Sequence, residues 1–156
     1  TIILQVFKFL EKISSQNSIL IIAFKGWSDA AEAATSAVDT IIKNYDSKKF
    51  ASFEEEEFFA FARERPNIKN SKSGRIIEWP HNDLYYIDNA INNTPLIILN
   101  GTEPHFKWKT FSKEVIDLCV SMNVSSVVTL GALLDSIPHT RGVKTQITGQ
   151  HEFMPE

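Results

Sequence analysis

The sequence is poor in the residues that build disulfides, metal centres and phosphate-binding loops. Its 156 residues include a single cysteine, Cys119, so no disulfide can form within the chain. The glycine patterns G-x-x-x-x-G-K-[ST] and G-x-G-x-x-G are absent, which excludes nucleotide binding by those two loops. No H-x-x-x-H or C-x-x-C spacing occurs among the four histidines, His81, His105, His139 and His151. We therefore expect neither a metal nor a cofactor.

Strong net charge and long apolar runs are also missing. The net charge is −3 and the pI is near 5.8, and no run of like charge exceeds Glu54–Glu57, which argues against nucleic acid and anionic membranes as partners. Residues 1–10, TIILQVFKFL, are apolar but about half as long as the roughly 20 residues of a membrane helix, and we interpret them as a strand or a docking segment. Without disulfides or a signal-peptide pattern, we expect a cytoplasmic protein.

The sequence does contain the composition of an ordinary globular domain. It is 43% hydrophobic and 22% charged, and a chain of this length can bury a sufficient core without disulfides or metals. We therefore assign residues 1–156 to a single domain.

Three apolar, β-branched runs predict strands that are buried on both faces: residues 19–24, 96–99 and 125–130. A glycine follows each strand: Gly26, Gly101 and Gly131. Such repeated endings suggest that the three strands finish in similar surroundings.

Two helices are predicted beside these strands. Asp29 occupies an N-cap position with Glu32 as the return half of a capping box, and a stripe of small apolar residues follows as far as Ile42. Residues 106–122 carry apolar side chains three or four positions apart. Alternating strands and helices favour an α/β fold, specifically a three-layer α/β/α arrangement with a mainly parallel sheet.

The middle of the chain is harder to interpret. Residues 50–53 predict a short strand, 54–57 a solvated turn, and 58–62 another strand or a partly exposed aromatic segment. Residues 75–79 and 84–87 could form the two arms of a hairpin.

Functional residues are expected where the three apolar strands end, because ligands of parallel α/β sheets bind outside the carboxyl ends of the strands. The catalytic candidates are Asp29, Glu103, His139 and Arg141. The wider ligand- or partner-binding set comprises Gly26, Trp27, Ser28, Asp29, Gly101, Glu103, Pro104, His105, Trp108, Gly131, Asp135, Pro138, His139, Thr140 and Arg141.

Several candidates also have a structural explanation, although His139 and Arg141 are harder to explain as packing residues. Asp29 and Glu103 could simply cap helices, and Arg141 could pair with Asp135. Residues 26–30, GWSDA, approach the nucleophile-elbow pattern G-x-S-x-G, but alanine replaces the last glycine, so a Ser28 hydrolase is a minor alternative. The three tryptophans could complete the core or anchor a protein partner.

Five blocks in order resemble the proteasome assembly chaperone 2 family: FKGWSDAAEAAT (24–35), RERP (63–66), EWP (78–80), LNGTEPHFKWKTF (99–111) and TLGALLDSIPHTR (129–141). The resemblance implies an α/β/α fold related to purine nucleoside phosphorylases and other phosphorylase/hydrolase-like proteins. It also implies a homo-oligomer with a protein partner, since eukaryotic and archaeal relatives help to assemble proteasome rings. Relatives usually continue further, so the resemblance implies that residues 1–156 are the N-terminal part of a longer family domain.

Several positions depart from the family pattern. Ser28 stands where relatives often have asparagine, Ala31 replaces a glycine, and Gly142 replaces a proline after PHTR. The C-terminal residues 153–156, FMPE, do not match the hydrophobic-Tyr-X tail by which archaeal relatives dock. Two hypotheses remain: a protein-binding factor resembling the assembly chaperones, or a phosphorylase/hydrolase-like small-molecule enzyme with its site at the strand ends.

Overall fold

The computed structural model describes residues 7–15 and 17–149. Part of the predicted first segment, together with His151 and the tail at 153–156, therefore lies outside the described residues. The strands are β1 (Phe7–Phe9), β2 (Ser18–Lys25), β3 (Ser47–Phe53), β4 (Asn67–Ser71), β5 (Gly74–Glu78), β6 (Asn82–Ile91), β7 (Thr94–Thr102) and β8 (Val124–Leu130). The helices are the 3₁₀ turn η1 (Ala30–Glu32), α1 (Ala33–Asn44), α2 (Glu55–Phe58) and α3 (Trp108–Ser121).

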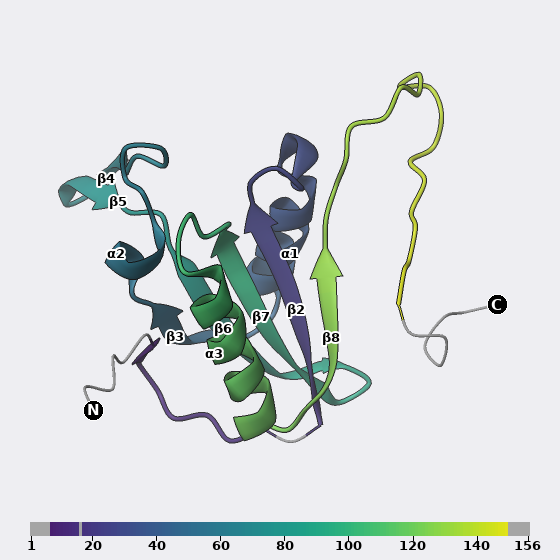
Figure 1. Cartoon of the computed structure of the whole chain (residues 1–156). Coiled ribbons are helices and arrows are strands. Elements are labelled where there is room, and N and C mark those ends of the chain that lie inside the picture. Colours follow the sequence, from purple (N-terminus) through teal and green to yellow (C-terminus); the bar gives the residue numbers. More distant parts are fainter. Residues whose placement is uncertain (1–6, 16, 150–156) are drawn as a thin grey trace.

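Six strands form a mixed sheet in the order β1-β3-β6-β7-β2-β8 (Figure 1). Three pairings are antiparallel and two are parallel, so the predicted mainly parallel sheet is wrong for the sheet as a whole. The three apolar runs predicted as strands are indeed parallel neighbours, in the order β7-β2-β8. The carboxyl ends of these three strands therefore lie next to one another at the same end of the sheet.

A short hairpin explains the antiparallel half of the sheet. Asn92 and Asn93 connect β6 to β7 and both have positive φ, 50° and 62°, which is the geometry of a two-residue hairpin turn. Asparagine tolerates this conformation better than most residues. The hairpin predicted between residues 75–79 and 84–87 is wrong, since β5 pairs with β4 in a separate two-stranded sheet and β6 pairs with β3 and β7.

One helix covers each face of the six-stranded sheet. Since alternate residues of a strand point to opposite faces, a single strand contacts both helices. Ile97 and Leu99 of β7 lie in one core cluster with Phe111 and Leu118 of α3. The intervening β7 residues Leu96 and Ile98 lie in the other cluster, with Ala34 and Val38 of α1.

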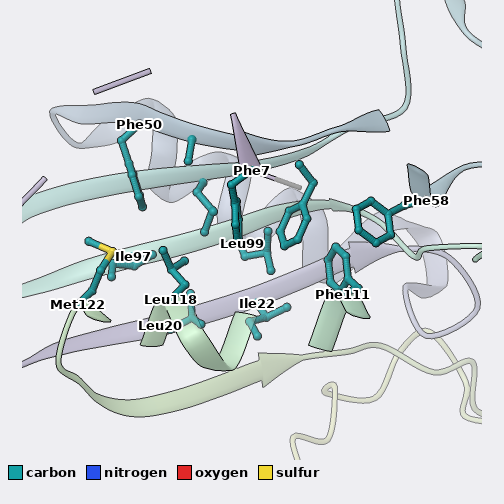
Figure 2. Close-up of a cluster of buried hydrophobic side chains, with 13 residues drawn as sticks. Phe7, Leu20, Ile22, Phe50, Phe58, Ile97, Leu99, Phe111, Leu118 and Met122 are labelled. Carbon is teal, nitrogen blue, oxygen red and sulfur yellow. The ribbon is translucent and has the colours of Figure 1, made fainter. Parts of the chain in front are cut away.

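Five of the thirteen buried residues in the α3-side core are phenylalanines (Figure 2). Phe111 stacks on Phe53 with ring centroids 4.2 Å apart, and Phe58 meets Phe111 edge to face at 5.3 Å. The predictions for residues 54–57 and 58–62 are wrong: Glu55–Phe58 form the short helix α2, and residues 59–62 form no strand but a connection and a turn. Phe58 ends α2 and is fully buried. This packing holds α2 against α3 and fixes the loop between β7 and α3.

Candidate functional site

A cavity of about 400 Å³ opens at the carboxyl ends of β2 and β7. We call it the strand-end pocket. Its lining residues come from the β2–α1 connection, the β7–α3 connection and the segment after α2: Lys25, Gly26, Trp27, Asp29, Glu32, Glu64, Thr102, Glu103, Pro104 and His105.

Glu103 is held over the turn that follows β2. Its backbone N–H donates to the Lys25 carbonyl at 3.0 Å. The Ser28 hydroxyl donates to one carboxylate oxygen at 3.2 Å, and the Trp27 N–H lies 3.5 Å from the other. A Cβ on Gly26 would lie only 2.7 Å from the Glu103 Cδ and Oε2 atoms, so a larger residue at this position would displace the carboxylate.

Asp29 is engaged by the start of α1. One carboxylate oxygen accepts the Ala34 N–H at 2.8 Å and the Thr35 N–H at 3.3 Å, and the other accepts the Thr35 hydroxyl. Asp29 is also buried, with 6% of its surface exposed. The predicted helix-capping role is therefore present, although α1 begins at Ala33 rather than directly after Asp29.

The predicted capping box with Glu32 does not form. Ala31 and Glu32 adopt left-handed backbone conformations, with φ of 55° and 56°, and η1 separates Asp29 from α1. The Glu32 carboxylate instead lies 4.0 Å from the Lys25 Nζ atom, which also lies 3.7 Å from Glu64. A glycine would adopt the Ala31 conformation without strain.

His105 presents one ring nitrogen toward a fixed donor. The Ala60 backbone N–H donates to the ring atom His105 Nδ1 at 3.1 Å. The backbone N–H of His105 donates to the Phe58 carbonyl at 2.8 Å. Because Nδ1 accepts a hydrogen bond, the neutral ring carries its proton on Nε2. The His105 ring can therefore serve the pocket as a hydrogen-bond donor.

The pocket carries more negative than positive groups. Four carboxylates, those of Asp29, Glu32, Glu64 and Glu103, face a single lysine. Trp27 lies at this pocket with 85% of its surface exposed, so its indole is available to another molecule.

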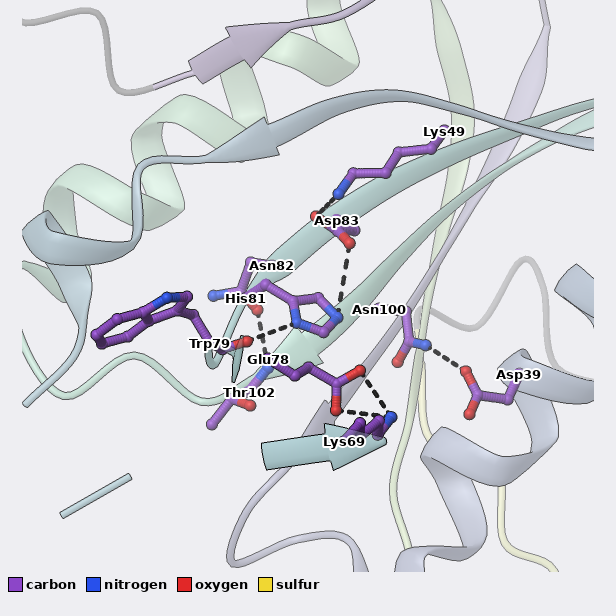
Figure 3. Close-up of polar contacts among 10 residues, drawn as sticks. All are labelled: Asp39, Lys49, Lys69, Glu78, Trp79, His81, Asn82, Asp83, Asn100 and Thr102. Carbon is purple, nitrogen blue, oxygen red and sulfur yellow. Dashed lines mark hydrogen bonds and ion pairs between the residues drawn. The ribbon is translucent and has the colours of Figure 1, made fainter. Parts of the chain in front are cut away.

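A polar network supports the pocket from the neighbouring strands (Figure 3). Buried Asp83 lies between Lys49, whose Nζ is 2.7 Å away, and His81, whose Nε2 is 3.5 Å away. Asn82 accepts the Thr102 N–H at 3.0 Å and joins the start of β6 to the end of β7. These contacts fix the strand end from which Glu103 and His105 follow.

The same network reaches α1 and perturbs one tyrosine. Asn100 of β7 donates to Asp39 of α1 at 2.7 Å (Figure 3). Burial raises the pKa of Tyr85 to about 12, and the negative charges of Asp83 and Asp39 act in the same direction. Tyr85 therefore keeps its proton to a higher pH than an ordinary tyrosine does.

Comparison with known proteins places the chain in a family. The family model described as PAC2 family matches residues 23–155. The chain belongs to the PAC2 family. The resemblance to proteasome assembly chaperones seen in the sequence is thereby confirmed. A search of curated proteins finds no match to the chain.

Solved structures agree with the PAC2 assignment. A PAC2 family protein from Streptomyces avermitilis is 32% identical, with a TM-score of 0.73 over 80% of this chain and 53% of its own. A proteasome-assembly chaperone homologue of Mycobacterium tuberculosis is 29% identical, with a TM-score of 0.72 over 79% of this chain and 52% of its own. Pyrococcus furiosus PbaB, an archaeal proteasome activator, is 17% identical with a TM-score of 0.58 over 79% of this chain and 49% of its own, a likeness in fold alone. The chain spans about half the length of these relatives.

The PAC2 blocks identified in the sequence contribute unequally to the pocket. Two of the three strand ends line it, and they contain six of the predicted site residues: Gly26, Trp27, Asp29, Glu103, Pro104 and His105. Ser28 is not part of the lining but donates a hydrogen bond to Glu103, and Gly101 packs against Asn82. Trp108 begins α3 and is half exposed outside the pocket lining.

The third strand end touches the β2–α1 connection but does not line the pocket. Ala132 donates its N–H to the Ser28 carbonyl at 2.7 Å and accepts the Ala30 N–H at 3.0 Å, and Gly131 lies against the same connection. The chain then leaves the sheet, and five predicted site residues lie on this segment outside the pocket lining: Asp135, Pro138, His139, Thr140 and Arg141. Asp135 bonds its neighbour Ser136, with no Arg141 ion pair in the described chain.

Sequence reasoning missed Lys25, Glu32, Glu64 and Thr102 as lining residues. Glu64 belongs to the RERP block, whose charged residues were a usable signal. Among the described residues, no group of three His, Cys, Asp or Glu side chains could hold a metal ion. In the same part of the chain, no helix is long and apolar enough to cross a membrane.

Proposed function

We propose that this chain is a non-enzymatic protein-binding factor whose partner contacts the strand-end pocket. The exposure of Trp27 at the pocket carries the proposal, because tryptophan is strongly enriched among the residues that dominate protein–protein binding energy. Its ring offers a large apolar area, and its N–H can bond to a partner. The surrounding carboxylates would orient a partner of complementary charge.

Family membership supports a proteasome-related partner. The M. tuberculosis relative is described as a proteasome-assembly chaperone homologue, and this chain is 29% identical to it. We therefore propose that the partner is a proteasome subunit or an assembly intermediate, that the chain acts in the cytoplasm, and that it works as a homo-oligomer.

The alternative is a phosphorylase- or hydrolase-like enzyme, and the side-chain contacts support it less well. The Asp29 carboxylate is occupied by three donors from α1. Ser28 donates to Glu103 rather than to a histidine, whereas a serine nucleophile needs a base to accept its proton. His139 and Arg141 are exposed on the segment after β8.

Binding to purified proteasome core subunits from the same organism tests the proposal. Surface plasmon resonance should detect a complex that Trp27→Ala weakens by about tenfold or more, as expected for an anchor residue costing more than about 1.4 kcal/mol. Ile68→Ala is the matched control, because Ile68 is also well exposed but lies on β4 outside the pocket lining. Equal binding by both variants, or no binding to any subunit, would reject the proposal.

The enzyme alternative has its own assay. Thermal-shift screening with nucleosides and inorganic phosphate should show no stabilisation of the chain under the protein-binding hypothesis. Stabilisation by such a ligand that is lost in Arg141→Ala would favour the enzyme instead.

A further inference from the structure

The edge strand β8 is built like an interior strand. It pairs with β2 on one side, and among residues 7–15 and 17–149 nothing pairs with its other side. Val127 lies beside Leu20 and faces the α3 side, whereas Val128 lies beside Ile21 and faces the α1 side. Both valines are about half exposed, at 52% and 43%.

Most of this edge also lacks the usual protection of an exposed strand. Natural edge strands carry charges, prolines or bulges that discourage pairing. The β8 sequence, VSSVVTL, contains no charged residue and no proline, and its register shift at Ser125 lies near the start of the strand, before residues 126–130. Apolar side chains on both faces are typical of a strand with neighbours on each side.

A second segment of the same chain, residues 143–148, has the sequence pattern of a strand but, within the described part of the chain, no strand beside it. Residues 143–148, VKTQIT, alternate Val143, Thr145 and Ile147 with polar residues, which is the pattern of a half-buried strand rich in β-branched residues. They belong to no helix or strand, and Val143 is 95% exposed. In Figure 1 this limb runs back in the direction opposite to β8.

We propose that residues 143–148 bind as an antiparallel strand to the open edge of β8 in the same chain. Residues 131–142 form the connection, so the two strands make a wide hairpin of the kind that antiparallel strands permit. Tethering favours this segment over a second copy, because a short linker holds it at an effective concentration in the millimolar range. Pairing satisfies the outer backbone groups of β8 and covers its valines.

The pairing has a consequence for the strand-end pocket. It converts residues 131–142, with His139 and Arg141, into a closed loop at the carboxyl end of β8, beside the β2–α1 connection that Ala132 already contacts. Basic side chains there complement the surplus carboxylates of the pocket. This role of the loop rests on the proposed function, whereas the strand pairing does not.

Disulfide scanning tests the pairing directly. In a Cys119→Ser background, Val127→Cys is combined in turn with Lys144→Cys, Thr145→Cys, Gln146→Cys and Ile147→Cys. A disulfide needs Cα atoms within about 7 Å and side chains that point the same way, and neighbouring residues of a strand point to opposite faces. Strand pairing therefore predicts one strong intramolecular crosslink, at the position directly opposite Val127, and little or none at the positions immediately beside it, which point to the other face.

Other patterns would overturn the proposal. Equal crosslinking at all four positions indicates a flexible arm, and disulfide-linked dimers indicate that a second copy occupies the edge. The single Val127→Cys variant, checked by circular dichroism, controls for folding.

Hydrogen exchange provides a readout that needs no cysteine. In the full chain, the β8 amides that point away from β2 should be protected from exchange by pairing with residues 143–148. Thr145→Pro or Gln146→Pro should reduce the protection of these amides, because proline removes a donor and disturbs the added strand. Unchanged protection in both proline variants would contradict the pairing. Neither experiment involves a protein partner, so failure of the proposed function would leave these results unaffected.

Discussion

Replacing Asp29 separates its structural role from a catalytic one. In Asp29→Ala, the amides of Ala34 and Thr35 lose their acceptor at the start of α1. Removing a helix-capping side chain costs about 0.5 to 2 kcal/mol, and leaving a buried donor unsatisfied costs about 1 to 3 kcal/mol. Because these two costs overlap, we expect the free energy of unfolding to fall by about 2 kcal/mol.

Two further variants make the comparison sharp. Asp29→Asn keeps one acceptor oxygen and should lose about 1 kcal/mol or less. Asp135→Ala, at an exposed aspartate that bonds only its neighbour, should stay within about 0.5 kcal/mol of the parent chain. Urea unfolding followed by circular dichroism measures all three. If Asp29→Ala unfolds like the parent chain but loses partner or ligand binding, the carboxylate serves the ligand and our structural explanation fails.

Two other predictions concern the strands that support the pocket. A Cβ at Gly101 would lie 2.0 Å from Asn82 Oδ1 and 2.3 Å from the His81 carbonyl oxygen, so urea unfolding should show Gly101→Ala destabilised by about 1 to 3 kcal/mol, whereas Gly142→Ala, with open space around it, should change little. Tyr85 should titrate near pH 12 in an ultraviolet titration of the folded chain. Since an unfolded tyrosine titrates near about pH 10, stability should fall as the pH rises from about 10 to 12, and Tyr85→Phe should reduce this fall.

The local strand signals were reliable because β-branched residues favour extended backbone. The predicted burial on both faces is wrong for residues 125–130, since β8 is a largely exposed edge strand. The apolar runs at residues 19–24, 96–99 and 125–130 all form strands, and the amphipathic pattern at 106–122 forms α3. Which strands pair with one another was harder to predict, because a run of β-branched residues does not specify the neighbouring strand. The Asn92-Asn93 turn was the missed signal: two asparagines between apolar segments predict a tight hairpin, which would have placed β6 antiparallel to β7.

The part of the pocket that the sequence predicted is the part that follows from the direction of the strands. The carboxyl ends of β2 and β7 had to lie together once the strands were parallel, so Asp29, Glu103 and His105 were found by position alone. Glu64 reaches the pocket through the packing of Phe58 and the bonds between α2 and the His105 loop. That tertiary contact has no periodic signature in the sequence.

The contacts of Gly26 and Glu103 explain why strand-end residues can look catalytic while serving structure. The Glu103 carboxylate over the turn after β2 accepts a hydrogen bond from the Ser28 hydroxyl and lies where a side chain at position 26 would otherwise be. The same turn delivers Trp27 to solvent and Asp29 to α1. One short segment therefore fixes the β7 connection, starts a helix and exposes an aromatic ring, which is an arrangement suited to presenting a rigid surface to a protein partner.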